Sequence, residues 1–203
     1  MARSLAVPDP RGARTRTRRR RALAFPQLSL DLGPSAPRWT WSRLVTASRH
    51  KDRIRERLEF VRRFFPELQG VTVHVGLAQK RGVLGWGSMD PERPGVWVRP
   101  RRLDYFTIAH EFTHLMQARR LVPRGERACD LWALARSPLV VDCWPGYLRL
   151  PRSLRRYRLG PREAALLCEA ARRAIAAREA GDRRYLQNFE REAARALLGS
   201  ARV

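Results

Sequence analysis

Lysine is almost absent from this chain, since Lys51 and Lys80 are its only lysines although lysine and arginine together number 42. Acidic residues are also few, at 19, so the formal net charge is +23 and the pI is about 11.7. Such a charge creates a long-range field that attracts polyanions, either nucleic acid or an anionic membrane surface. A solvated arginine-rich face is the alternative explanation.

Cysteine and long apolar runs are scarce as well. The three cysteines, Cys129, Cys143 and Cys168, form no CxxC pair, which favours free thiols in a reducing cytoplasm over a secreted disulfide framework. No run of 18 apolar residues occurs, so we expect no membrane-spanning helix. Prolines at positions 8 and 10 interrupt the short apolar start, and we expect no signal peptide.

The remaining composition, with 44% hydrophobic residues, is sufficient for a buried core. Residues 1–38 contain the block GARTRTRRRR and five prolines, which predicts a disordered arm. Apolar periodicity predicts a helix over 49–65, and alternation predicts strands over 71–77 and 95–99. Further helices are expected over 104–120 (with Asp104 as its cap), 126–136, 161–180 and 182–198. We therefore expect a small α+β domain with a short antiparallel or mixed sheet over 39–151, and a helical C-terminal extension over 152–203.

Two of the four histidines lie in the sequence HEFTH, inside the helix expected over 104–120. A spacing of four places His110 and His114 on one face of that helix, where both imidazoles can reach one metal ion. Glu111 follows the first histidine and can deprotonate a metal-bound water. The alternative is that the histidines only cap or pack.

A catalytic zinc usually takes three protein ligands, and no histidine follows His114. The third ligand is therefore a carboxylate or an upstream histidine. In GERACD, Glu126 and Asp130 share one helix face, so Glu126 can bind zinc while Asp130 accepts the outer N–H of a ligand histidine. The reverse assignment, with Asp130 as the ligand, stays open, as does an acidic helix start without a metal.

HEFTH followed by Glu126 and Asp130 resembles the gluzincin branch of the zincin metallopeptidases, in its minimal form, and is similar to SprT-like proteases. The SprT-like pattern usually has a further histidine, which is absent here. The resemblance implies a zincin-like domain in which His110, His114 and Glu126 bind Zn²⁺, Glu111 is the general base and Asp130 orients a ligand. It also implies that an edge strand before the active-site helix aligns the substrate backbone, and GVWVR at 95–99 occupies that position.

Several other residues have two readings each. Tyr147 or Tyr105, or one of several arginines, could donate to the oxyanion of a peptide-cleavage intermediate, although a tyrosine in a proline-rich segment often only packs. His74 is expected to be a core or surface histidine. Cys129 is expected to point away from both Glu126 and Asp130 as a buried structural residue.

The arm contains QLSLDL at 27–32, which resembles the short peptide by which bacterial replication and repair proteins bind the sliding clamp. Its contacts would be Gln27, Leu28, Leu30 and Leu32. Arginines of the same arm would bind DNA phosphates without sequence preference, namely Arg16, Arg18, Arg19, Arg20 and Arg21. Trp39 and Trp41 with Arg38 could stack on bases or anchor the arm to the domain. The peptide could equally dock on its own domain.

Together these patterns predict a cytoplasmic, nucleoid-associated zinc metallopeptidase, a hydrolase that acts on protein or peptide substrates and is recruited to DNA or to the clamp. The alternative function is an inactive basic protein that binds nucleic acid or the clamp and keeps a structural HExxH helix. The C-terminal helices could pack on the domain, pair with another subunit or lie on a membrane surface. The oligomeric state does not follow from the sequence.

Overall fold

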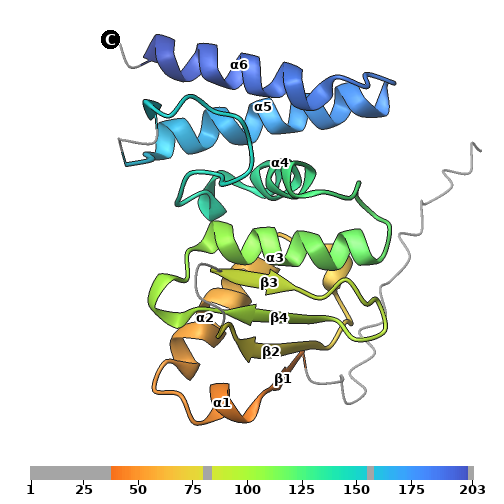
Figure 1. The fold of residues 1–203 in the computed structure, drawn as a ribbon, viewed down its shortest axis with the longest axis vertical. Helices are drawn as coiled ribbons and strands as arrows, with labels where there is room; N and C mark the ends of the chain where they lie inside the picture. The colour runs from red at the N-terminus through yellow and green to blue at the C-terminus, as the bar shows by residue number, and fades with distance from the viewer. Residues whose placement is uncertain (1–37, 80–83, 155–157, 201–203) are drawn as a thin grey trace, which may run out of the picture. The chain divides into compact units, whose positions relative to one another are not determined.

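Four short strands form a mixed sheet in the order β1-β2-β4-β3 (Figure 1). The strands are β1 (Trp39–Trp41), β2 (Val73–Leu77), β3 (Gly85–Gly87) and β4 (Gly95–Val98). Strands β1, β2 and β4 are parallel to one another. Strand β3 is antiparallel to β4, with Trp86 opposite Trp97. The computed structural model describes residues 38–79, 84–154 and 158–200, all within one compact unit of residues 35–203. The predicted small α+β class with a mixed sheet is confirmed.

The prediction that GVWVR forms an edge strand is wrong. GVWVR does form a strand, β4, but β4 lies between β2 and β3 and has no free edge. The edge strand nearest the helix that carries HEFTH is β3, Gly85–Gly87, where no strand was expected. Three residues are too few for alternation to reveal a strand, and β3 forms because it pairs with β4.

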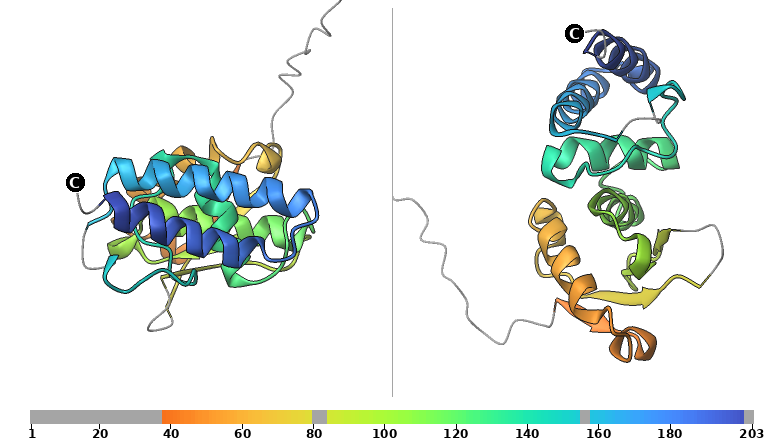
Figure 2. Two further views of the ribbon diagram at one scale, coloured as in Figure 1. Left: turned by 90° about the horizontal axis from the view of Figure 1, so that it is seen from above. Right: turned by 90° about the vertical axis from the view of Figure 1, so that its left-hand side faces the viewer.

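The core lies between the sheet and two helices, α2 (Lys51–Arg62) and α3 (Tyr105–Ala118). Figure 2 shows α2 on one face of the sheet and α3 beside β3. The apolar stripe of α2 and alternate residues of β2 and β4 are fully buried: Ile54, Leu58, Val61, Val73, Val75, Val96 and Val98. At full burial each such side chain contributes about 1.5–3 kcal/mol.

Trp39 anchors the N-terminal end of the described chain in this core. Its ring stacks on Phe112 with centroids 6.1 Å apart, and its indole N–H donates to Glu59 Oε1 at 2.6 Å. Of the two readings for this tryptophan, anchoring to the domain is therefore correct. The other predicted features of the arm, residues 1–37, lie outside the described residues.

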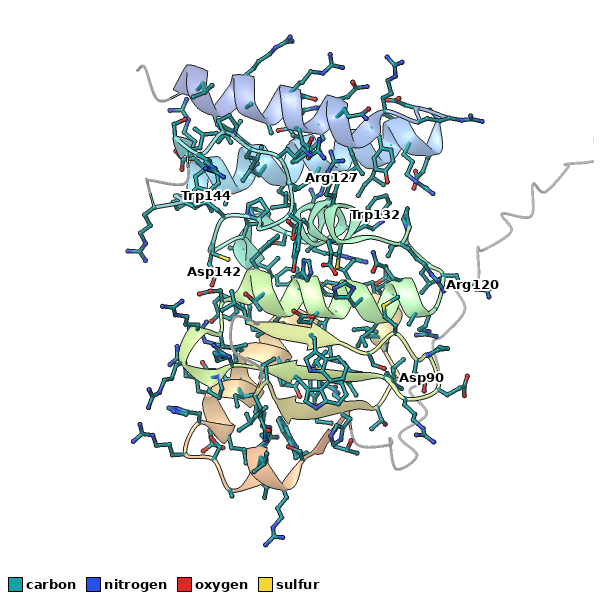
Figure 3. The ribbon with its side chains drawn as sticks, viewed as in Figure 1. Asp90, Arg120, Arg127, Trp132, Asp142 and Trp144 are labelled. Carbon is teal, nitrogen blue, oxygen red and sulfur yellow. The ribbon has the colours of Figure 1, made fainter. Side chains whose placement is uncertain are left out.

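The start of α3 is capped from an unexpected position. Asp104 occupies the N-cap position but its side chain makes no capping hydrogen bond. The carboxylate of Asp142 instead accepts from the backbone N–H groups of Tyr105 (2.9 Å) and Phe106 (3.0 Å). Figure 3 shows Asp142 beside this end of α3. The cap comes from 37 residues away, so local sequence could not indicate it.

The other helices build further layers on α3. α4 (Glu126–Arg136) packs along α3, and α5 (Pro161–Glu179) and α6 (Tyr185–Ser200) follow on the far side of α4 (Figure 1). Arg172 donates to the carbonyls of Ala135 and Arg136, and Trp132 meets Tyr185 edge to face at 6.0 Å. The C-terminal helices thus pack on the domain. The short elements are α1 (Arg43–Thr46), η1 (Pro66–Leu68), η2 (Pro100–Arg102) and η3 (Pro138–Val140).

Candidate metal centre

His110 and His114 project from one face of α3, and each ring is held through its Nδ1 atom. His110 Nδ1 lies 2.7 Å from Asp130 Oδ1, and His114 Nδ1 lies 2.9 Å from Gln117 Oε1. Both partners can only accept at these atoms, so each Nδ1 carries the proton. In the neutral rings, the lone pairs of both Nε2 atoms are therefore available to a metal ion.

Glu126 brings a carboxylate oxygen between these two nitrogens. It is the first residue of α4, after a short turn that ends at Gly125 with φ of +106°, a conformation that favours glycine. Glu126 Oε2 lies 3.0 Å from His110 Nε2 and 3.4 Å from His114 Nε2. This turn lets α3 and α4 lie side by side.

These separations are close to those of a metal site. In a tetrahedral site with bonds of about 2.0–2.2 Å, neighbouring ligand atoms lie about 3.3–3.6 Å apart, so the 3.4 Å separation fits and the 3.0 Å separation is shorter, at hydrogen-bond length. The lone pairs of two neutral imidazoles and one carboxylate repel each other unless a cation, either a proton or a metal ion, lies among them. The donor set of two imidazoles and one carboxylate suits a borderline divalent cation.

Asp130 supports the site from behind instead of entering it. Its side chain is 1% exposed and its Oδ2 accepts the backbone N–H groups of Tyr147 (2.7 Å) and Leu148 (3.2 Å). Because Oδ1 is bonded to His110, both oxygens are fully used by the protein. Of the two assignments that the sequence left open, the geometry favours Glu126 as the ligand and Asp130 as its support.

Cys129 lies closer to the histidines than the sequence suggested. His110, His114 and Cys129 offer ligand atoms that all lie within 4.8 Å of one another, so this group could hold a metal ion. Cys129 is also fully buried, as expected. The thiol donates a hydrogen bond to the His110 carbonyl oxygen (3.0 Å). Burial raises the pKa of this thiol well above the usual range. Without a metal it is therefore a neutral thiol, which makes Glu126 the stronger candidate for a third ligand.

Glu111 is buried beside the three ligand atoms. The Gly87 backbone N–H donates to its carboxylate, but Oε2 has no hydrogen-bond partner among the described residues. Burial, with the nearby charge of Glu126, raises the pKa of Glu111 to about 7, although His110 and Gly87 oppose this. A buried carboxylate oxygen without a partner indicates a missing water or ion, and a pKa near neutrality suits proton transfer.

The pKa values of the two histidines are shifted in opposite directions. Burial lowers the pKa of His110, but the hydrogen bond and charge of Asp130 outweigh burial and raise it overall. Burial and the neighbouring His110 lower the pKa of His114. His114 is therefore the more readily neutral ligand, while Asp130 makes His110 the more basic donor.

A cleft of about 440 Å³ opens onto these groups, and strand β3 forms one side of it. A Cβ on Gly85 would lie 2.9 Å from Glu111 Oε1, and one on Gly87 would lie 2.5 Å from the Glu111 carbonyl oxygen. Glycine is thus needed at both positions for the strand to approach α3. The Ser88 N–H donates to the Gly95 carbonyl, and the Arg99 N–H donates to the Leu84 carbonyl. In this antiparallel register the N–H and C=O groups of Gly85 and Gly87 point away from β4.

The structure brings Tyr147 to the cleft and leaves two other candidates outside it. The Tyr147 ring stacks on His110 with centroids 5.4 Å apart, and the residue lines the cleft. Tyr105 lies at the start of α3 against Phe60 (4.7 Å). His74 on β2 faces Thr40 (3.2 Å), as expected for a histidine outside the site.

Gln117 belongs to the site although its type and spacing raised no expectation. Its Nε2 donates to the carbonyls of Pro123 (2.7 Å) and Gly125 (3.1 Å), while its Oε1 accepts from His114. One amide therefore fixes the ring of a histidine and the turn that leads to Glu126. Its position three residues after His114, on the same helix face, was the available signal.

The chain matches no protein-family model, no curated protein and no solved structure.

Proposed function

We propose that this protein is a zinc-dependent metallopeptidase in which His110, His114 and Glu126 hold the metal. The observation that carries the proposal is the convergence of both Nε2 atoms on Glu126 Oε2, at 3.0 and 3.4 Å, beside a buried carboxylate oxygen of Glu111 with no partner among the described residues. Zinc in such a site polarises a carbonyl and acidifies water.

Glu111 has the location and proton affinity of a general base. Its carboxylate faces the cleft next to the ligand atoms, with a pKa raised by burial to about 7. In the proposed reaction it accepts the proton of the attacking water and returns it to the leaving amine nitrogen. Gly87 orients this carboxylate through its backbone N–H.

The edge of the sheet supports a peptide as the substrate. The outward N–H and carbonyl of Gly85 and the outward carbonyl of Gly87 lie along the cleft and can pair with an extended chain, whereas the Gly87 N–H donates to Glu111. Tyr147, which also lines the cleft, is the proposed donor to the oxyanion.

Glu111→Gln tests the proposal, because the variant keeps the shape of the site but cannot accept a proton. We expect zinc-loaded wild-type protein to cleave unfolded β-casein, and the variant to bind zinc equally without cleaving. Proteolysis by the variant at the wild-type rate would remove Glu111 from this role. Wild-type protein that binds no zinc would favour the alternative, an inactive basic protein that binds nucleic acid or the clamp.

Recruitment to DNA or to a sliding clamp is a separate part of the proposal, carried by sequence outside the described residues. Deletion of 27–32 is expected to abolish clamp binding, and replacing the arginines at 16 and 18–21 is expected to weaken DNA binding and its salt dependence. Undiminished binding by either variant would contradict that part alone.

Within the part of the chain that the structure describes, no helix combines the length and the hydropathy required to cross a bilayer.

A further inference from the structure

Two tryptophans stack on the face of the sheet that lies opposite α2 and α3. Trp86 on β3 and Trp97 on β4 have ring centroids 3.7 Å apart and an interplanar angle of 1°. They are direct partners in the antiparallel register. Trp86 nevertheless remains 47% exposed, whereas the large apolar side chains of the core are buried. An exposed indole that is supported from beneath provides a rigid apolar surface.

Glycines make this arrangement possible. A Cβ on Gly76 would lie 2.2 Å from Trp97 Cδ1, and a Cβ on Gly95 would lie 2.8 Å from Trp97 Cη2. The indole of Trp97 therefore lies across the sheet over both glycines, and it supports Trp86 from one side. The remaining exposure of Trp86 indicates a surface available for another group.

The position of Trp86 connects this surface to the candidate metal centre. Side chains alternate along a strand, so Gly85 and Gly87 face Glu111 and His114 while Trp86 faces the other way. Trp86 and the exposed Met89 also line the same cleft as the ligand residues. Residues with exposed apolar side chains elsewhere, such as Leu139 on η3, do not line that cleft.

We infer that Trp86 is a specificity-determining residue, which binds a large apolar or aromatic side chain of the substrate close to the cleaved bond. This inference rests on the proposed peptidase function. An extended substrate that pairs with the outer edge of β3, the last strand of the described sheet, places the residue opposite Trp86 on the same face as the indole. Its neighbours on either side project toward α3 and the metal centre. Stacking on Trp86 then fixes which bond lies beside Glu111.

The first test maps the bonds that zinc-loaded protein cleaves in unfolded β-casein, by mass spectrometry. We expect the cleaved bonds to share a large apolar residue at one fixed distance from the cut. Trp86→Ala should lower kcat/KM at those sites on the order of tenfold, as expected for a lost apolar contact. Trp86→Phe should retain most of the preference, and Leu139→Ala is the control with an exposed apolar side chain outside the cleft.

The second test measures binding without cleavage. A peptide that spans the best casein site should bind zinc-loaded Glu111→Gln about tenfold more tightly than its alanine-substituted counterpart. The difference should vanish when Trp86→Ala is added. Equal thermal midpoints of the variants exclude unfolding as the cause.

The outcomes separate this inference from the proposed function. Absence of any casein cleavage by the wild-type protein would contradict the function and the inference together. Cleavage with no shared residue, or with a preference that Trp86→Ala leaves intact, would overturn the inference alone. Binding of oligo(dT) that requires Trp86, with casein sites unchanged, would assign the surface to nucleobases and also overturn it.

Discussion

The carboxylate of Asp130 lies 2.7 Å from His110 Nδ1 and holds the ring with its Nε2 toward Glu126. Two backbone N–H groups, from Tyr147 and Leu148, occupy its second oxygen. One buried side chain on α4 therefore orients His110 of α3 and also fixes the segment that carries Tyr147 to the cleft.

Asp130→Asn should weaken zinc binding. The amide keeps the size of the side chain but removes the charge that makes His110 a stronger donor, and loss of such a partner typically lowers metal affinity 10–100-fold. Competition with a chromophoric chelator measures the affinity. Asp142→Asn is the matched control, since that carboxylate accepts two N–H groups at the start of α3 without contacting a histidine. An unchanged affinity in Asp130→Asn would show that Asp130 has only a structural role.

Glu111 should make the metal-free protein less stable as the pH rises. Burial raises its folded-state pKa from 4.5 to about 7, so its contribution is fully present below pH 4.5 and is lost as the pH increases through 7. A shift of this size corresponds to at most about 3 kcal/mol. Glu111→Gln should therefore raise the thermal midpoint of metal-free protein at pH 8 and change it little at pH 4.

The control for that titration is Glu56→Gln, at an exposed position on α2. This variant should follow the wild-type pH dependence. The same dependence in metal-free Glu111→Gln would mean that another group causes it.

Gly87→Ala should damage both the fold and the site. A methyl group at this position would lie 2.5 Å from the Glu111 carbonyl oxygen and 2.8 Å from His114 Cβ, and α3 cannot move aside without losing core contacts. We expect a loss of about 1–3 kcal/mol in the free energy of unfolding and a large loss of peptide cleavage. Gly199→Ala on α6, where nothing lies within 4 Å, should leave both unchanged. Wild-type stability in Gly87→Ala would contradict the close contact between β3 and α3.

Glu190 should be necessary for the attachment of α6. Its carboxylate is 9% exposed and accepts from Arg127 on α4 (2.7 Å) and from the Arg149 backbone N–H (2.8 Å). Removing it leaves a partly buried arginine unpaired, so Glu190→Ala should cost about 3 kcal/mol in urea unfolding. Glu192→Ala, which breaks an exposed pair with Arg173, should cost less than about 1 kcal/mol. If Glu190→Ala lowers the free energy of unfolding no more than Glu192→Ala does, Glu190 contributes no more than an exposed ion pair.

The sequence predicted the parts of the site that depend on helical periodicity. His110 and His114 share a face because they are four residues apart, and Glu126 and Asp130 share another for the same reason. The start of α4 at Glu126 and its end at Arg136 match the expected range. A short turn between two amphipathic helices left few ways to arrange them, so the histidines and Glu126 could be brought together without a structure.

Features that depend on contacts distant in sequence were missed or misassigned. β1 and β3 have three residues each, and both exist because they pair with a neighbouring strand. No strand was predicted at Gly85 and Gly87. Their lack of side chains allows β3 to lie close to Glu111 and His114. The resemblance placed GVWVR at the edge, and local alternation does not encode strand order. The burial of Cys129 matches the expectation, but its proximity to His110 and His114 was not predicted.

X-ray absorption at the zinc edge of protein reconstituted with one equivalent of Zn²⁺ tests the central claim most directly. With His110, His114 and Glu126 as ligands, the spectrum should show only nitrogen and oxygen neighbours, at about 2.0–2.2 Å, with two imidazoles per zinc. A sulfur neighbour at about 2.3 Å would assign the third position to Cys129 and contradict the proposed site, and failure to retain zinc would contradict it altogether.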